Sequence, residues 1–158
     1  MQLKGCIMKT DHIEKCLTLK APVSRVWRAL TDHVEFGQWF HAKLDGPFVP
    51  GRVIRARITY PGFEHYKWEA IVQKMEPERL FSFTWHPYAI DSGVDYSKET
   101  PTLVEFHLEK AAGGTLLSLR ESGFEKIPAG RRPEAFWMNS RGWREQLRNI
   151  KHYVTEAT

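Results

Sequence analysis

The sequence predicts an α+β fold in which a six-stranded antiparallel sheet packs around one long C-terminal helix. Three observations lead to this prediction. Short stretches of alternating apolar and polar residues, typical of strands, recur along the chain. Turn residues separate consecutive stretches, so neighbouring strands are joined as hairpins and run antiparallel. The longest periodic segment, residues 132–155, has helical spacing and must bury its apolar stripe on the concave side of the sheet.

The N-terminal part is expected to form one strand and two short helices. Residues 13–20 alternate, and one strand face carries Ile13, Lys15, Leu17 and Leu19. Pro22 suits the first position of a helix, because its φ is already helical and its missing N–H is not needed there. The residues that follow place one apolar stripe on this helix: Val23, Val26, Trp27 and Leu30. Residues 33–40, with Trp39 and Phe40, form a second short helix or turn.

Three strands are expected next, at residues 52–60, 65–75 and 79–86. Their connections are Pro61-Gly62 and a turn at Glu76-Pro77. A loop of two or four residues in the second turn pairs Val72 with Phe81, Ala70 with Phe83 and Trp68 with Trp85. A three-residue loop instead moves Phe81, Phe83 and Trp85 to the other face of the sheet.

Residues 87–101 form a polar loop, and a connection of this length in a small domain is either functional or mobile. The last hairpin joins strands at residues 102–110 and 115–121 around Gly113-Gly114. One face of this hairpin is apolar except for a single carboxylate, and it carries Val104, Phe106, Leu108, Leu117, Leu119 and Glu121.

The C-terminal helix has two distinct sides. Its inward stripe contains Phe136, Ser140, Trp143, Leu147, Ile150 and Val154. A basic side lies about 100° further round the helix and contains Arg141, Arg144, Arg148 and Lys151. The predicted element order is therefore β-α-α-β-β-β-β-β-α.

Composition indicates one soluble globular unit. The 158 residues fit a flexible lead-in at residues 1–11 and a single domain at residues 12–158. The net charge is 23 − 19 = +4, without the dense basic stripe of a nucleic-acid-binding protein. Cys6 and Cys16 lack metal or redox spacing, and we expect them to be reduced thiols in the cytoplasm. No apolar run approaches the roughly 18 residues of a membrane span.

No common catalytic or cofactor motif is present. The chain lacks a nucleophile elbow, a phosphate-binding loop, a dinucleotide-binding glycine motif and a zinc-protease motif. His65 and His86 are expected on neighbouring strands, but the sequence shows no third ligand for a metal. We therefore predict no catalytic residue, no metal and no cofactor.

The aromatic content of 13% exceeds what a simple core needs. Pockets for apolar ligands are mostly hydrophobic with a few polar groups, and Trp and Tyr add a hydrogen-bond donor. We predict a ligand cavity lined by Trp39, Phe40, Tyr66, Trp68, Phe83, Trp85, Phe106, Glu121, Phe136 and Trp143. Glu121 shares its strand face with apolar residues. If its side chain points inward, it is a polar anchor or a general acid/base in the cavity. Otherwise it is a strand-end residue that reaches solvent or pairs with an arginine.

Several segments resemble the activator of Hsp90 ATPase homologue 1-like family, which belongs to the START-like (SRPBCC) superfamily. The first is Ala21-Pro22-Val23-Ser24-Arg25-Val26-Trp27-Arg28-Ala29-Leu30-Thr31-Asp32, followed by Trp39-Phe40. The others are residues 79–85, 113–124 and 139–143, and the resemblance runs from about residue 12 to 154 in the expected order. It implies the helix-grip (Bet v 1-like) fold, a curved sheet around the long helix with an internal cavity. Members of the wider group bind lipids, sterols, hormones or polyketides there.

These observations favour a binding module for a hydrophobic or aromatic small molecule, held between the sheet and the C-terminal helix. The first alternative is a protein-interaction module, similar to a chaperone regulator, that uses the basic side of the helix. The second is an enzyme of the cyclase or hydrolase type that uses a lone carboxylate. We expect no nucleic-acid or membrane partner, and either a monomer or a homodimer.

Overall fold

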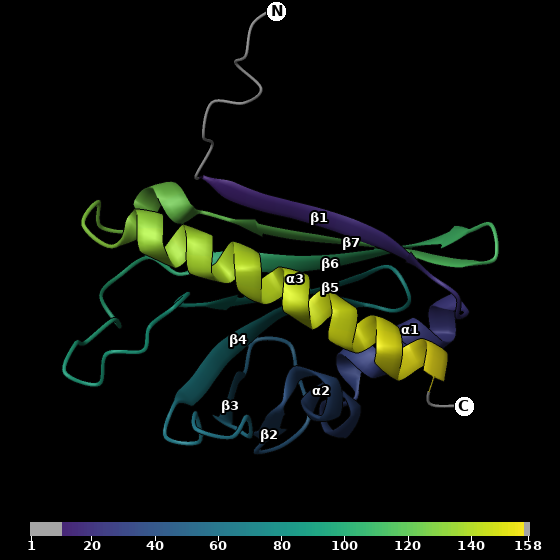
Figure 1. Ribbon diagram of the computed structural model, residues 1–158, viewed down its shortest axis with the longest axis horizontal. Helices are drawn as coiled ribbons and strands as arrows, with labels where there is room; N and C mark the ends of the chain where they lie inside the picture. Colours follow the sequence, from purple (N-terminus) through teal and green to yellow (C-terminus); the bar gives the residue numbers. More distant parts are fainter. Residues whose placement is uncertain (1–10, 157–158) are drawn as a thin grey trace, which may run out of the picture.

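The computed structural model describes residues 11–156, which form one sheet of seven strands, three α-helices and a short 3-10 turn (Figure 1). The strands are β1 (His12–Leu19), β2 (Ala42–Leu44), β3 (Val53–Ile58), β4 (Lys67–Glu76), β5 (Leu80–Trp85), β6 (Thr102–Ala111) and β7 (Gly114–Ser122). The helices are α1 (Val23–Thr31), α2 (His33–Phe40) and α3 (Arg132–Glu156), and the turn is η2 (Phe124–Lys126). Of the lead-in predicted at residues 1–11, only Asp11 lies within the described residues.

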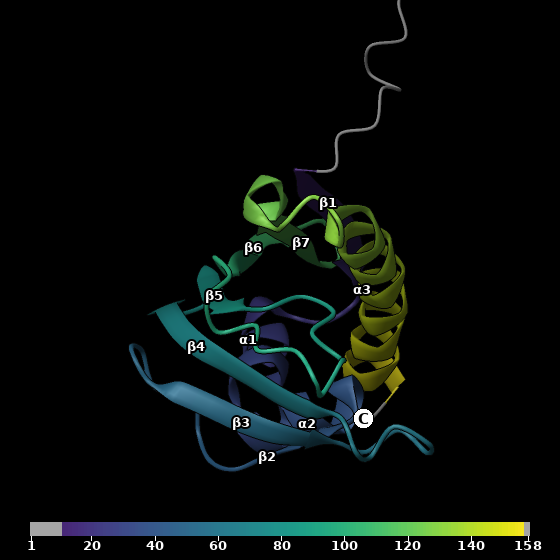
Figure 2. The ribbon, with the colours of Figure 1, turned by 90° about the vertical axis from the view of Figure 1, so that its left-hand side faces the viewer.

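The sheet is antiparallel throughout, in the order β1-β7-β6-β5-β4-β3-β2. Strands β2 to β7 follow one another as neighbours, and β1 joins the far edge by pairing with β7. The sheet is strongly curved, and α3 lies along its open, concave side (Figure 2). Helices α1 and α2 close the end near the C-terminus of α3 (Figure 1). The predicted α+β architecture is confirmed.

The sheet has seven strands within residues 11–156, not the six that the sequence predicts. The additional strand, β2, pairs with β3 through Ala42↔Ile58 and Leu44↔Ala56. Three residues are too few to show an alternating pattern, and β2 forms only because the preceding helix delivers the chain to the free edge of β3.

The hairpin of β4 and β5 combines features of both predicted registers. Its loop has three residues between Glu76 and Leu80, but the ladder also contains an irregularity between Val72 and Lys74. A loop with an odd number of residues moves the side chains of β5 to the opposite face of the sheet. The extra residue of this β-bulge moves them back. Val72 therefore pairs with Phe83 rather than Phe81, while the apolar residues of both strands still share the concave face.

Helices α1 and α2 begin and end at well-defined contacts. Pro22, predicted as the first helical residue, is instead the N-cap of α1, because its backbone is extended at ψ 157°; the helix begins one residue later, at Val23. The Asp32 side chain accepts hydrogen bonds from the N–H groups of Val34 and Glu35 at the start of α2. The Trp39 indole N–H donates to the Ala29 carbonyl oxygen over 2.8 Å and joins the two helices.

Helix α3 buries the predicted stripe against the sheet. Trp143 is 2% exposed and Ile150 is fully buried, while the four residues of the basic side are all exposed. The concave sheet face supplies the facing core, in which Phe83 and Phe106 are fully buried. None of the helices within residues 11–156 combines the length and hydropathy that a membrane span requires.

The close contact between α2 and β2 depends on Gly37. A Cβ at this position would overlap the backbone carbonyl oxygen of Ala42, which cannot move without disrupting β2. We expect Gly37→Ala to lower the free energy of unfolding by about 1–3 kcal/mol, measured by urea denaturation. The control is Gly46→Ala, where a Cβ meets no atom within 4 Å. Equal losses for the two variants would show that this contact does not constrain the fold.

Candidate functional site

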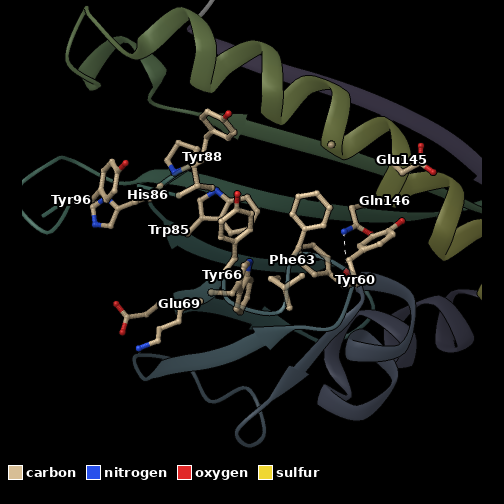
Figure 3. Close-up of a pocket in the computed structure, with 18 of the residues that line it drawn as sticks. Tyr60, Phe63, Tyr66, Glu69, Trp85, His86, Tyr88, Tyr96, Glu145 and Gln146 are labelled. Carbon is tan, nitrogen blue, oxygen red and sulfur yellow. Dashed lines mark hydrogen bonds between the residues drawn. The ribbon is translucent and has the colours of Figure 1, made fainter. Parts of the chain in front are cut away.

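The main candidate site is a cavity of about 720 Å³ between the sheet and α3. Its wall comes from the end of α2, from β3 and β4 and their connection, from the end of β5 and the loop that follows it, and from the middle of α3 (Figure 3). Eight aromatic residues line it: Phe40, Tyr60, Phe63, Tyr66, Trp68, Trp85, Tyr88 and Tyr96. Another depression of about 760 Å³, around Pro22 and Gly114, has no aromatic residue in its wall. The aromatic cavity therefore has the character of a site for an apolar molecule.

A side pocket of about 110 Å³ adjoins the main cavity along α3. Four residues line both spaces: Phe40, Trp85, Gly142 and Gln146. Two more, Asn139 and Trp143, line the side pocket but not the main cavity. The rings of Trp85 and Trp143 are stacked, with centroids 5.5 Å apart and planes 29° apart. These two indoles fix the shape of the wall where the sheet meets the helix.

Glu121 determines where these indoles lie. Trp85 Nε1 donates to Glu121 Oε2 over 2.7 Å, and Trp143 Nε1 donates to Oε1 over 2.8 Å. Thr102 Oγ1 donates to Oε2 over 2.6 Å, and Asn139 Nδ2 lies 3.0 and 3.2 Å from the two oxygens. The carboxyl group thus joins the ends of β5 and β7, the start of β6 and the middle of α3.

Glu121 is fully buried, and its four hydrogen-bond donors are all uncharged groups. Burial raises the pKa of Glu121 above its ordinary value, and the hydrogen bonds from Thr102, Trp85, Asn139 and Trp143 offset only part of this effect. A protonated carboxyl fits the same network, because its hydroxyl can donate to Thr102 Oγ1 while its remaining lone pairs accept from the indoles.

The loop between β5 and β6 is tied down by Arg131, which lies just before α3. Arg131 Nη2 lies 2.8 Å from Glu99 Oε1, and both side chains are mostly buried. Arg131 Nη1 donates to the carbonyl oxygens of Pro87 and Tyr88, and the guanidinium lies 4.7 Å from the centre of the Tyr96 ring. These contacts hold Tyr88 and Tyr96 in the cavity wall (Figure 3). The loop predicted to be functional or mobile is therefore a tethered part of this wall.

Similarity to known proteins identifies the family. The sequence model described as "Activator of Hsp90 ATPase homolog 1-like protein" matches residues 20–155. The chain belongs to this family. Among curated protein sequences, none matches the chain.

Solved structures with low sequence identity share the fold of this Hsp90-activator-like domain. MLL2253 from Mesorhizobium loti is 20% identical, with a TM-score of 0.73, over 93% of this chain and 98% of that chain. The Aha1 dimer from Colwellia psychrerythraea is 18% identical, with a TM-score of 0.69, over 90% of this chain and 95% of that chain. DynU16, a protein in the dynemicin biosynthetic locus, is 22% identical, with a TM-score of 0.69, over 91% of this chain but only 47% of that chain. These likenesses confirm the helix-grip fold.

The residues predicted to line a cavity occupy three different places in this family member. Phe40, Tyr66, Trp68 and Trp85 lie on the wall of the main cavity, and Trp143 lies in the side pocket. Glu121 lies behind the wall, hydrogen-bonded to Trp85 and Trp143. The remaining four, which are not in either wall, are packed in the core: Trp39, Phe83, Phe106 and Phe136.

Sequence reasoning missed several wall residues that come from turns. Tyr60 and Phe63 flank the Pro61-Gly62 turn, and Tyr88 and Tyr96 belong to the long loop. The sequence feature that could have identified these wall residues is the presence of aromatic residues in otherwise polar connections. The sequence left open whether His65 and His86 lie close together on neighbouring strands or face solvent. His65 is exposed in the connection before β4, and within residues 11–156 there is no group of three His, Cys, Asp or Glu side chains that could hold a metal ion.

The raised pKa of Glu121 predicts a specific pH dependence of stability. The folded state retains the proton on Glu121 to a higher pH than the unfolded chain does. The contribution of Glu121 to stability is therefore complete below about pH 4.3, the ordinary glutamate value. This effect is lost as the pH rises through the folded-state pKa. The stability advantage of the wild-type protein over Glu121→Gln should therefore shrink with rising pH, by at most about 1.4 kcal/mol per pH unit.

Urea denaturation of both proteins between about pH 4 and 8, a range that starts near the ordinary glutamate pKa, measures this difference. Glu125→Gln, which removes an exposed carboxylate in the turn after β7, is the matched control for a change in net charge. An advantage that grows as the pH rises would mean that the four donors lower the pKa, and would contradict the assignment.

Proposed function

We propose that this domain binds a hydrophobic or aromatic small molecule in the cavity between the sheet and α3. The observation that carries the proposal is the volume of about 720 Å³ combined with eight aromatic residues in the wall. Ligand sites are typically concavities of roughly 300–1,000 Å³ with mostly apolar walls and a few polar groups. Burial of apolar surface contributes about 25 cal/mol per Å² to such binding.

Gly142 supports the same interpretation. It lies in the middle of α3, where glycine costs about 1 kcal/mol relative to alanine. A Cβ at this position would meet no atom within 4 Å, so close packing does not require a glycine. Gly142 instead lines both the main cavity and the side pocket. The absence of a side chain there keeps this space open for a ligand.

Filling the cavity at Gly142 separates binding from folding. We expect Gly142→Leu to weaken binding of 1-aminoanthracene, an uncharged fluorescent aromatic probe, at least tenfold in a fluorescence titration. The free energy of unfolding should stay equal or rise by up to about 1 kcal/mol, because leucine favours helix more than glycine does.

Lys151→Leu is the matched control, since it adds the same side chain at an exposed position of α3 outside the cavity. It should bind the probe like the wild-type protein. If the wild-type protein does not bind the probe, or if Gly142→Leu binds it equally well, this cavity is not the ligand site.

The geometry gives less support to an enzyme that uses Glu121. Both carboxyl oxygens accept hydrogen bonds from protein donors, and the residue has no exposed surface. A general acid or base must come within hydrogen-bond reach of the reacting group. Glu121 instead positions Trp85 and Trp143, and its contribution to function is structural.

A second candidate function is regulation of a chaperone through the basic side of α3. Four exposed cations share this side, Arg141, Arg144, Arg148 and Lys151, and exposed Trp137 precedes them. Arg148 is the one of the four with a carboxylate within 4.0 Å among the described residues, Glu145 at 3.7 Å. The family description names Hsp90, and acidic segments of such a partner would complement this charge.

Charge reversal tests this second candidate independently. Arg144→Glu combined with Arg148→Glu should weaken binding to purified Hsp90 at least tenfold, measured by biolayer interferometry, because two attractive pairs become repulsive. Binding of 1-aminoanthracene should not change. Equal Hsp90 binding by the wild-type and reversed proteins, or no binding by either, would exclude this surface as a chaperone contact.

A further inference from the structure

The cavity wall contains two buried polar atoms that have no hydrogen-bond partner within the described chain, Trp68 Nε1 and His86 Nδ1. Buried polar groups in native proteins are nearly always paired, so an exception needs an explanation. Both residues belong to the lining of the same cavity, Trp68 from β4 and His86 from the loop directly after β5. Each nitrogen has almost no accessible surface, so an occupant of the cavity supplies its missing partner only when the ring turns towards the cavity.

Trp68 differs from the other deeply placed indoles of this protein. The N–H of Trp39 donates to a backbone carbonyl oxygen, and those of Trp85 and Trp143 donate to Glu121. Trp68 is only 8% exposed, yet its N–H has no acceptor within the described chain. An indole nitrogen can only donate, so the group that satisfies it must be a hydrogen-bond acceptor.

The charged residues of the wall argue for an uncharged occupant. Glu69 pairs with Arg55 at 2.8 Å, and Glu145 pairs with Arg148 at 3.7 Å. Asp95 accepts from the backbone N–H and the hydroxyl of Ser97. Lys67 is exposed to solvent. The wall, all of it within the described residues, thus offers no buried, unpaired charge, and burying an ion without a counter-charge is unfavourable.

The rings around Trp68 indicate the shape of the ligand. Its ring centroid lies 5.7 Å from that of Phe40 and 5.8 Å from that of Trp85, both of which also line the cavity. Both contacts are edge-to-face, and such an arrangement extends readily to one more flat ring. Apolar area, one fixed donor and no free charge together define a narrow class of molecule.

We infer that the cavity takes an uncharged, flat aromatic molecule with a carbonyl-type oxygen, and that Trp68 Nε1 donates a hydrogen bond to this oxygen. The inference rests on the proposed function and names its ligand class. His86 Nδ1 supplies a second polar contact, as donor or acceptor according to the tautomer of the ring. Trp68 is then the residue that selects carbonyl-bearing ligands from hydrocarbons of the same shape.

A matched pair of probes tests the role of Trp68. Fluorene and 9-fluorenone have the same three-ring frame and differ by one carbonyl oxygen. By isothermal titration calorimetry, the wild-type protein should bind 9-fluorenone at least tenfold more tightly than fluorene. Trp68→Phe keeps an aromatic ring but removes the N–H; it should reduce the preference to less than threefold and leave fluorene affinity within about a factor of two.

Two further measurements keep the test specific. Trp27→Phe, which alters an indole outside the cavity wall, should retain the full preference for 9-fluorenone. In ¹H–¹⁵N spectra, 9-fluorenone but not fluorene should shift the indole N–H signal that Trp68→Phe removes. A merely structural role of Trp68 would not produce this ligand-dependent shift.

The outcomes distinguish the inference from the proposed function. Equal binding of both probes by the wild-type protein, or a preference that survives in Trp68→Phe, would overturn the inference and leave the cavity as a ligand site. Tighter binding of fluorene-9-carboxylate than of 9-fluorenone would show that the ligand is an anion, which also overturns it. Failure of every probe to bind would overturn the inference together with the proposed function.

Discussion

The buried carboxyl group of Glu121 is the interaction on which the arrangement of the cavity depends. It has no contact with solvent, and it accepts hydrogen bonds from Trp85, Thr102, Asn139 and Trp143. These partners come from the sheet and from α3, so one side chain couples the two layers. Two large indoles stay in fixed orientations because a buried acceptor that lost its donors would be costly.

The cavity exists because the curved sheet and α3 diverge beyond this network. Beside β6, the helix stripe and the concave face are in close contact, since the ring centroids of Phe106 and Trp143 lie 5.7 Å apart. Toward β3 and β4, the gap is wider and is lined by turn residues and by the loop that Arg131 holds. The Glu121 network supports one side of the cavity, and the loop held by Arg131 supports the other. The space between them keeps a defined shape although no side chain fills it.

Several features of fold and site could be predicted from local patterns. Alternation identified six strands, and helical spacing identified the stripe of α3 through Trp143, Leu147 and Ile150. The same alternation put Glu121 on one strand face with Leu117 and Leu119, but left open whether its side chain points inward or reaches solvent at the end of the strand. It could not show which groups would offset the cost of burying it, because Trp85 lies 36 positions away in the chain and Trp143 lies 22 positions away. The β-bulge between β4 and β5 was equally hidden, since the added residue has no distinctive sequence.

The sequence by itself determined the family, the order of all elements except the short strand β2 and the turn η2, and the inward faces of the strands other than β5. The tertiary structure alone decided which aromatic residues became wall and which became core. Strand β5 illustrates this: Phe83 is fully buried, while Trp85, on the same face two residues later, lines the cavity. Side-chain periodicity specifies a face, but the distance to the opposite layer depends on sheet curvature and on the position of α3. That distance decides whether a ring meets another ring or an open space.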